Sequence, residues 1–129
     1  MIYLDYSATT PVSYEVFDTI SKVTKEFIGN ANSINALGGK SASLLESATK
    51  QIADILGINT SEITYTSGAT EANNMALIGV AMKYHKRGKH IIVSKLEHPS
   101  IYAICDYLKS IGFSIDYVNN DSEGLIDFD

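Results

Sequence analysis

The sequence predicts an α/β fold in which N-terminal helices precede part of a mostly parallel, helix-flanked sheet. Short segments rich in β-branched or aromatic residues lie at 62–67, 90–95 and 113–118, and they are typical of strands. Helical patterns lie between them, at about 71–86 and 99–111, and this alternation indicates an α/β sheet. Because helix-length connections imply parallel neighbouring strands, functional groups should gather beyond the carboxyl ends of the strands.

A first helix is expected ahead of the sheet, beginning near Pro11, because proline suits the first helical turn. Apolar residues recur along it at i, i+4, i+7 and i+11, which predicts one apolar stripe formed by Val16, Ile20, Val23 and Phe27. Gly29 is the expected end of this helix.

Residues 29–39 are rich in Gly, Asn and Ser and are predicted to form a loop. A second helix should run from about 41 to 56, with Gly57 closing it. We therefore expect residues 1–40 to form an N-terminal helical and loop segment, apart from an α/β portion at 41–129. Residues 121–129 lead from a polar turn into a new apolar pattern, so we expect the α/β domain to be truncated at its C-terminus.

The composition argues against several classes of partner. The chain has 129 residues and 45% hydrophobic content, with 15 acidic against 10 basic residues, and its lysines are scattered, which argues against nucleic acid. No apolar run approaches the roughly 18 residues of a membrane span, and the N-terminus lacks the layout of a signal peptide. We therefore expect a cytoplasmic protein that binds neither nucleic acid nor membranes.

Cysteine and histidine usage gives no sign of a metal site. The single cysteine, Cys105, can form neither an internal disulfide nor a multi-thiolate metal site. It lies in an apolar helical pattern, which favours a small buried side chain. The histidines His85, His90 and His98 do not have the spacing of metal ligands.

The segment 64–71 lies where a strand is expected to pass into a helix, and Gly68 permits a tight turn there. The N–H groups of Gly68, Ala69 and Thr70, with the Thr70 hydroxyl, could hold a phosphate at the positive end of the helix dipole. Unlike a Walker loop the segment carries no lysine, so a phosphate monoester suits it better than a nucleoside triphosphate. The alternative is an ordinary turn with Thr70 as the N-cap.

His98 lies at the next strand-to-helix junction, just ahead of Pro99. By topology it should face the same sheet edge as residues 67–70. An imidazole there could stack on a planar cofactor and transfer protons near neutral pH, as a general acid or base. The alternative is a histidine that only caps the helix, with Glu97 as a solvated carboxylate.

Several signatures occur in order along the chain: YLDYSATTP at 3–11, GN at 29–30, TSGATEANN at 66–74, EHPS at 97–100 and DSEGLID at 121–127. Together they resemble the N-terminal region of NifS/IscS-type cysteine desulfurases, which are class V aminotransferase-fold enzymes of PLP (pyridoxal 5'-phosphate) fold type I. The resemblance covers essentially the whole chain, but only about the opening third of those enzymes. It implies an incomplete PLP-dependent transferase major domain.

The resemblance also implies roles for individual residues. Ala69 and Thr70, with Gly68, correspond to the phosphate-binding segment of PLP, and His98 corresponds to the histidine that stacks on the pyridine ring and takes part in proton transfer. In the loop 29–39, Ala31 and Asn35 depart from the proline and histidine common in the family, so no catalytic role is assigned to it.

For the parent enzyme, the resemblance implies that L-cysteine is converted to L-alanine. The sulfur would pass as a persulfide to acceptor or scaffold proteins, for iron–sulfur cluster or thio-cofactor synthesis, and the enzyme would be a homodimer. The resemblance implies that the family's PLP-binding lysine and persulfide-forming cysteine lie outside residues 1–129, since neither Lys95 nor Cys105 matches them. The chain by itself is therefore expected to be inactive.

Three alternatives remain open from the sequence. Another class V enzyme, such as a selenocysteine lyase or an aminotransferase of small amino acids, would share the same segments. A non-catalytic α/β module could use residues 67–70 to bind a phosphate ligand or a protein. The chain could also dimerise through helix faces that further residues would otherwise cover.

Overall fold

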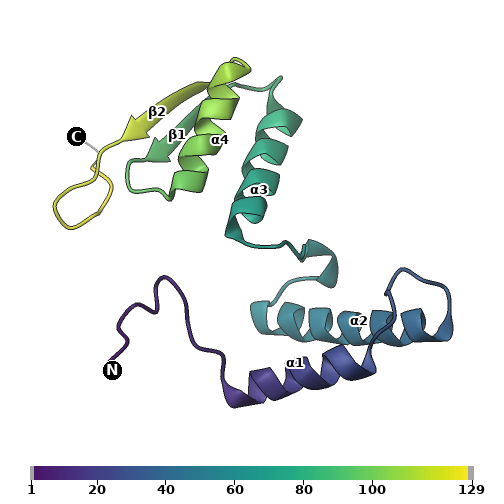
Figure 1. Cartoon of the computed structure of the whole chain (residues 1–129). Helices are drawn as coiled ribbons and strands as arrows, with labels where there is room; N and C mark the ends of the chain where they lie inside the picture. The colour runs from purple at the N-terminus through teal and green to yellow at the C-terminus, as the bar shows by residue number, and fades with distance from the viewer. Residues whose placement is uncertain (1, 128–129) are drawn as a thin grey trace. The chain divides into compact units, whose positions relative to one another are not determined.

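The computed structural model describes residues 2–127 and divides into two compact units, Met1–Thr64 and Tyr65–Asp129 (Figure 1). The first unit is helical, and the second contains helices packed with a parallel pair of strands. This confirms the predicted α/β class. The predicted roles of 1–40 and 41–129 as parts of a larger enzyme stay a prediction.

Helix α1 (Tyr14–Glu26) begins later than predicted. Its N-cap is Ser13, whose hydroxyl accepts a hydrogen bond from the backbone N–H of Val16 at 3.4 Å. The predicted start at Pro11 is wrong, because a side-chain cap two residues further on satisfies the free N–H groups of the first turn. The apolar stripe is only partly covered, and Val16 and Ile20 remain about half exposed.

Helix α2 (Ala36–Leu56) begins earlier than predicted, and the expected start near 41 is wrong. The side chain of Asn35 accepts from the backbone N–H of Gly38 at 2.8 Å and caps the helix inside the Gly/Asn/Ser segment. Gly38 is buried, and a Cβ there would clash with the carbonyl oxygens of Ser33 and Asn30. The helix ends at Gly57, in the left-handed conformation with φ of 67°, as predicted.

The strand predicted at 62–67 is not formed. Thr60–Glu62 is a short 3-10 helix, η1, in which Glu62 accepts hydrogen bonds from the backbone and side chain of Asn59. Residues 63–66 have no regular secondary structure. The β-branched composition of the segment was misleading, because a strand needs a hydrogen-bonded neighbour, and the only paired strands in the described part of the chain are β1 and β2.

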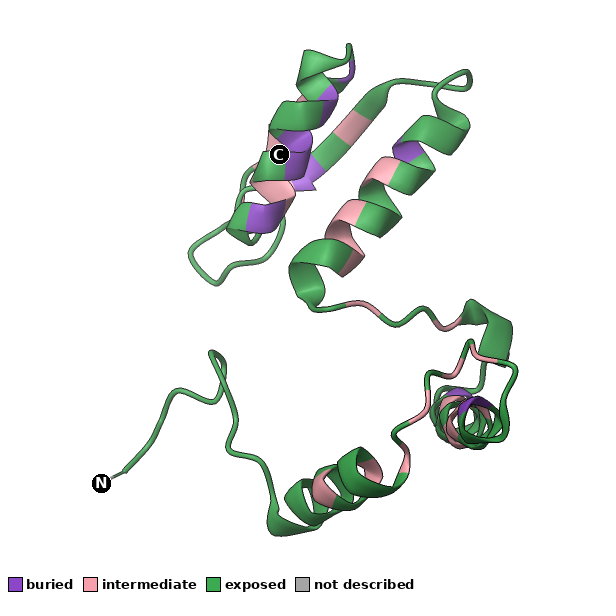
Figure 2. Ribbon diagram, turned by 45° about the vertical axis from the view of Figure 1, so that its right-hand side comes forward, coloured by how far each residue is buried: buried purple, intermediate pink, exposed green. Residues whose placement is uncertain are grey.

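The second unit contains α3 (Ala69–Tyr84), β1 (His90–Ser94), α4 (Pro99–Ser110) and β2 (Ser114–Val118). The strands pair in parallel, from His90 with Ser114 to Ser94 with Val118, and α4 connects them. This confirms the predicted helical crossover. The core contains Ala81 from α3, Ile104 and Leu108 from α4, and Phe113; Figure 2 shows buried residues along one side of α4.

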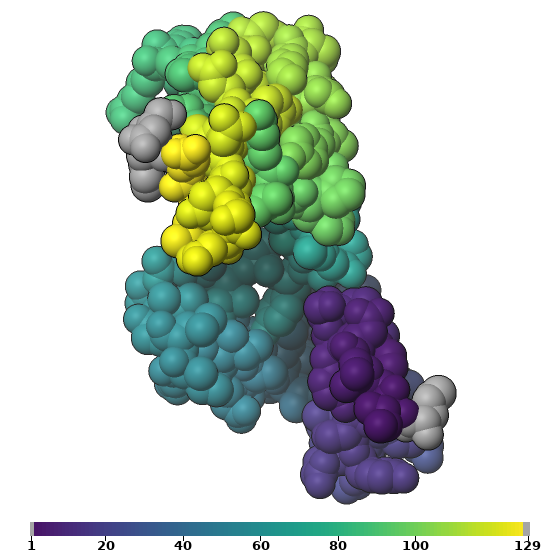
Figure 3. All heavy atoms as spheres, turned by 90° about the vertical axis from the view of Figure 1, so that its left-hand side faces the viewer, coloured from purple at the N-terminus to yellow at the C-terminus, as the bar shows by residue number. Residues whose placement is uncertain are grey.

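A compact turn follows β2 and forms the yellow end of the chain in Figure 3. Asp121 closes it, because its carboxylate accepts from the backbone N–H groups of Glu123 and Leu125, each at 2.9 Å. An antiparallel bridge joins Asn120 to Ile126. Lys95, just after β1, donates to the side chain of Asn119 at 2.6 Å, so this turn is tied to the carboxyl end of the strands.

None of the helices described in residues 2–127 has the length and apolar character needed to cross a membrane.

Candidate functional site

The first junction with predicted chemistry is the turn at 66–71, which leads into α3. The carboxylate of Glu71 accepts from the backbone N–H of Ser67 at 2.6 Å and from its hydroxyl at 2.7 Å. Thr66 donates its hydroxyl to the carbonyl of Gly68 at 3.2 Å. These local bonds hold the turn, so that residues 68–70 enter the helix directly.

Gly68, not Thr70, is the N-cap of α3, and no side chain caps it. The alternative with Thr70 as the N-cap is therefore wrong, because Thr70 already lies inside the first helical turn. The first N–H groups of a helix have no partner within the helix. No atom lies within 4 Å of the place where a Cβ would stand on Gly68, which leaves space for an anion beside these donors.

The negative charge of Glu71 is stabilised by hydrogen bonds within this turn. The backbone N–H of Ser67, and then its hydroxyl, lower the pKa of the Glu71 carboxyl below the ordinary value of 4.5. The carboxylate occupies the N–H of Ser67, and the role of Gly68, Ala69 and Thr70 as phosphate donors stays a prediction.

The second junction places His98 as the N-cap of α4, with Pro99 in the first turn. Its Nδ1 accepts from the backbone N–H of Ser100 at 3.2 Å and lies 2.9 Å from the Ser100 hydroxyl. The alternative, in which His98 caps the helix, is thus correct for its Nδ1 atom. It does not conflict with a functional role, because capping uses one ring nitrogen and His98 is exposed.

A hydrogen bond links the first two turns of α3 to the start of α4. Nδ2 of Asn73 donates to Oγ of Ser100 at 3.0 Å, and Ser100 is itself buried. Asn73 lies one helical turn after Thr70, so the predicted phosphate-binding turn and His98 are connected through Asn73 and Ser100. The sequence reasoning did not assign Asn73 or Ser100. Asn73 lies inside the signature at 66–74 and Ser100 inside the signature at 97–100. Membership of these signatures was the only sign in the sequence that pointed to them.

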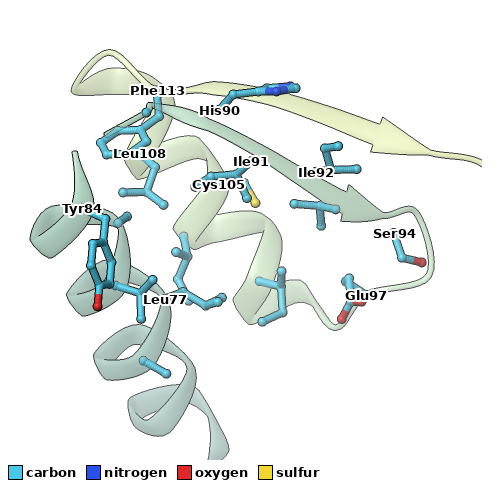
Figure 4. A pocket seen from close by; sticks show the side chains of 17 residues that line it. Leu77, Tyr84, His90, Ile91, Ile92, Ser94, Glu97, Cys105, Leu108 and Phe113 are labelled. Carbon is cyan, nitrogen blue, oxygen red and sulfur yellow. The ribbon is translucent and has the colours of Figure 1, made fainter. Parts of the chain in front are cut away.

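A cavity of about 520 Å³ lies in the second unit, apart from the two junctions described above. Figure 4 shows that side chains from α3, β1 and α4 surround it, among them Leu77, Ile92 and Leu108. Its lining is mostly apolar and includes neither His98 nor residues 67–70. The polar junctions, not this cavity, are therefore the candidate site.

Cys105 also lines the cavity and is 3% exposed. The prediction that it is a small buried side chain is confirmed. Among residues 2–127, no group of three or more His, Cys, Asp or Glu residues is arranged to hold a metal ion.

The sequence profile of the aminotransferase class-V family matches residues 2–129. The chain belongs to this family. The class V chain is 44% identical over 128 residues to "Cysteine desulfurase IscS" of Dictyoglomus turgidum, covering 99% of the chain and 32% of that protein. It thus spans about a third of the length of the curated relatives it matches.

Solved structures agree with this assignment. The class V chain superposes on a "NIFS-LIKE PROTEIN" with a TM-score of 0.92 and 36% identity, covering 98% of the chain and 35% of that protein. A structure titled "SspA in complex with cysteine" matches with a TM-score of 0.88 and 35% identity, covering 97% of the chain and 36% of that protein. The predicted resemblance to NifS/IscS-type proteins is confirmed.

Proposed function

We propose that this chain is the N-terminal portion of a PLP-dependent cysteine desulfurase. The enzyme would convert L-cysteine to L-alanine and pass the sulfur as a persulfide to acceptor proteins. The observation that carries the proposal is the 44% identity to IscS of Dictyoglomus turgidum across 99% of the chain. The cysteine-bound structural neighbour supports cysteine as the substrate.

The phosphate of PLP would bind at the start of α3, where the residues fit it. Gly68 is an uncapped helix start with open space at its Cβ position, and Ala69 and Thr70 follow it. The N–H groups of these three residues and the Thr70 hydroxyl would donate to the phosphate oxygens, and the helix dipole would favour its negative charge. When bound, PLP supplies an electron sink for carbanion chemistry.

His98 would lie against the cofactor ring and move a proton at Nε2. Its Nδ1 is engaged by Ser100, which orients the imidazole. Histidine is suited to this role because its ordinary titration range lies near neutral pH. The link from Ser100 to Asn73 supports the proposal, because it connects His98 to the helix that would hold the phosphate.

The remaining catalytic groups would come from outside residues 1–129, as the comparison with the longer relatives suggests. Cys105 is unsuited to accept sulfur, because it is 3% exposed. Lys95 is engaged with Asn119 at the strand end. The chain alone would therefore be inactive, and the complete enzyme would be a cytoplasmic homodimer that serves iron–sulfur cluster or thio-cofactor synthesis.

The proposal is tested by the products that the gene product carrying this chain forms from L-cysteine in the presence of PLP. Alanine and sulfide should appear in equal amounts when a thiol reductant is present to release the persulfide. Selenocysteine and mixtures of small amino acids with 2-oxo acids are the comparison substrates.

Each outcome has a distinct meaning. Equimolar alanine and sulfide from L-cysteine support the desulfurase. Turnover of selenocysteine alone, or transfer of amino groups without sulfide, would replace it with another class V activity. A folded gene product that does not bind PLP would favour the non-catalytic phosphate-binding module.

A further inference from the structure

Asn73, Ser100 and His98 form a chain of hydrogen bonds from α3 to the start of α4. Nδ2 of Asn73 donates to Oγ of Ser100 at 3.0 Å, and this oxygen lies 2.9 Å from Nδ1 of His98. The backbone N–H of Ser100 donates to the same Nδ1 at 3.2 Å. Ser100 is only 8% exposed, so its hydroxyl is largely shielded from competing water.

The direction of these bonds decides where the imidazole carries its proton. A backbone N–H and an amide NH₂ can only donate. Because the Ser100 hydroxyl accepts from Asn73, its own proton is available for Nδ1 of His98. The hydroxyl could donate or accept, but the backbone N–H of Ser100 can only donate to Nδ1, so Nδ1 must be the acceptor and the proton of the neutral ring lies on Nε2.

The other ring nitrogen is left for chemistry. Within residues 2–127, no hydrogen bond reaches Nε2 of His98, and the residue is exposed. We propose that Asn73 and Ser100 are positioning residues that hold His98 in the Nε2–H tautomer, with this nitrogen presented as a proton donor. The positioning role rests on the proposed function of His98, whereas the tautomer does not depend on a cofactor.

The other two histidines provide internal references. Nδ1 of His85 lies 2.6 Å from the carbonyl oxygen of Met82. A carbonyl only accepts, so His85 must carry its proton on Nδ1. Nε2 of His90 lies 2.7 Å from a carboxylate oxygen of Asp116, so His90 must carry its proton on Nε2. One protein therefore contains both tautomers for comparison with His98.

The first experiment records nitrogen-15 NMR shifts of the imidazole rings in the labelled chain, without cofactor, at about pH 9, where ordinary histidines are neutral. His98 should show a pyridine-type shift at Nδ1 and a pyrrole-type shift at Nε2, as His90 does and opposite to His85. A His98 spectrum of the His85 type would overturn the proposal, whether or not the gene product is a desulfurase.

The second experiment reverses the polarity of the hydrogen-bond chain with Asn73→Asp. A carboxylate can only accept, so the Ser100 proton should turn towards it, and Nδ1 of His98 should then keep only the backbone N–H of Ser100 as its donor. The Nδ1 signal should stay of the pyridine type and move further from the pyrrole range, because one of its two donors is lost. Asn74→Asp adds the same charge one residue away, where the native Asn74 side chain bonds to the Thr70 carbonyl, and should leave the His98 shifts unchanged.

A double-mutant cycle shows whether the effect passes through the hydroxyl of Ser100. In a Ser100→Ala background, Asn73→Asp should no longer move the His98 signals. If it moves them equally in both backgrounds, or in neither, Ser100 does not relay the effect and the proposal fails. The His85 and His90 signals report whether each variant is folded. If Asn73→Asp is unfolded, the wild-type comparison with His85 decides alone.

Discussion

The carboxylate of Glu71 closes the turn before α3 by accepting two hydrogen bonds from Ser67, from its backbone N–H at 2.6 Å and from its hydroxyl at 2.7 Å. The pair lies four residues apart at a helix start, where a negative charge also interacts favourably with the helix dipole. The turn thus keeps its shape through its own side chains, next to Gly68, Ala69 and Thr70, which are the donors proposed for the phosphate.

This pair makes the turn sensitive to acid. The pKa of Glu71 is lowered by the backbone N–H of Ser67 and then by its hydroxyl, so the stabilisation is present above the unfolded pKa and is lost as the pH falls through the folded pKa. The Ser67 amide signal should titrate in NMR with a midpoint below 4.5. Ser67→Ala should move the midpoint partly towards 4.5, because the backbone bond remains. A wild-type midpoint at or above 4.5 would refute the bonding scheme.

Two adjacent glycines in the first turns of α2 should respond oppositely to alanine. Gly38→Ala should lower the free energy of unfolding by about 2 to 4 kcal/mol, because its Cβ would clash with the carbonyls of Ser33 and Asn30. Gly39→Ala meets no atom within 4 Å and should raise the free energy of unfolding by up to about 1 kcal/mol through helix propensity. Urea denaturation measures both, and equal effects would contradict the packing at Gly38.

The Thr70 hydroxyl should contribute to cofactor affinity. Thr70→Val keeps the shape but removes a hydrogen bond to a charged phosphate, which is worth about 1.5 to 3 kcal/mol. PLP affinity of the gene product should therefore fall about 10- to 100-fold, as measured by equilibrium dialysis. Thr24→Val is the control, since the Thr24 hydroxyl bonds to Ile20 within α1. The phosphate assignment is wrong if both variants bind PLP as tightly as the wild type.

Cys105 should be almost unreactive in the folded chain. Its side chain is 3% exposed, so a thiol reagent must wait for local opening. Its modification should be about 100-fold slower than that of an exposed cysteine. The matched control is Ala103→Cys in a Cys105→Ala background, because Ala103 is exposed on the same helix. Comparable rates would mean that Cys105 is accessible and a candidate for chemistry after all.

The sequence predicted secondary structure best where the local residue pattern agrees with the contacts that the segment makes in the folded chain. The strands at 90–94 and 114–118 and the helix between them were predicted to within a residue or two, because apolar residues at the right spacing also form the core. Helix starts were harder to predict. Ser13 and Asn35 each cap a helix, but several polar residues nearby could have done so, and only the folded backbone shows which one accepts the bond.

The candidate site was predictable in its residue types but not in its connections. Gly68, Ala69, Thr70 and His98 were identified from the signatures, whereas Asn73 and Ser100 were not. They lie 27 residues apart, and no local rule indicates that their side chains meet. The missing strand at 62–67 has a related cause, since pairing depends on a neighbour that the segment itself does not specify.

A crystal structure of the gene product with PLP is the most direct test of one cofactor spanning the two junctions. We expect the phosphate oxygens within hydrogen-bond distance of the N–H groups of Gly68, Ala69 and Thr70, and the pyridine ring against the imidazole of His98. A phosphate bound away from the start of α3, or a ring that does not touch His98, would contradict the proposed site.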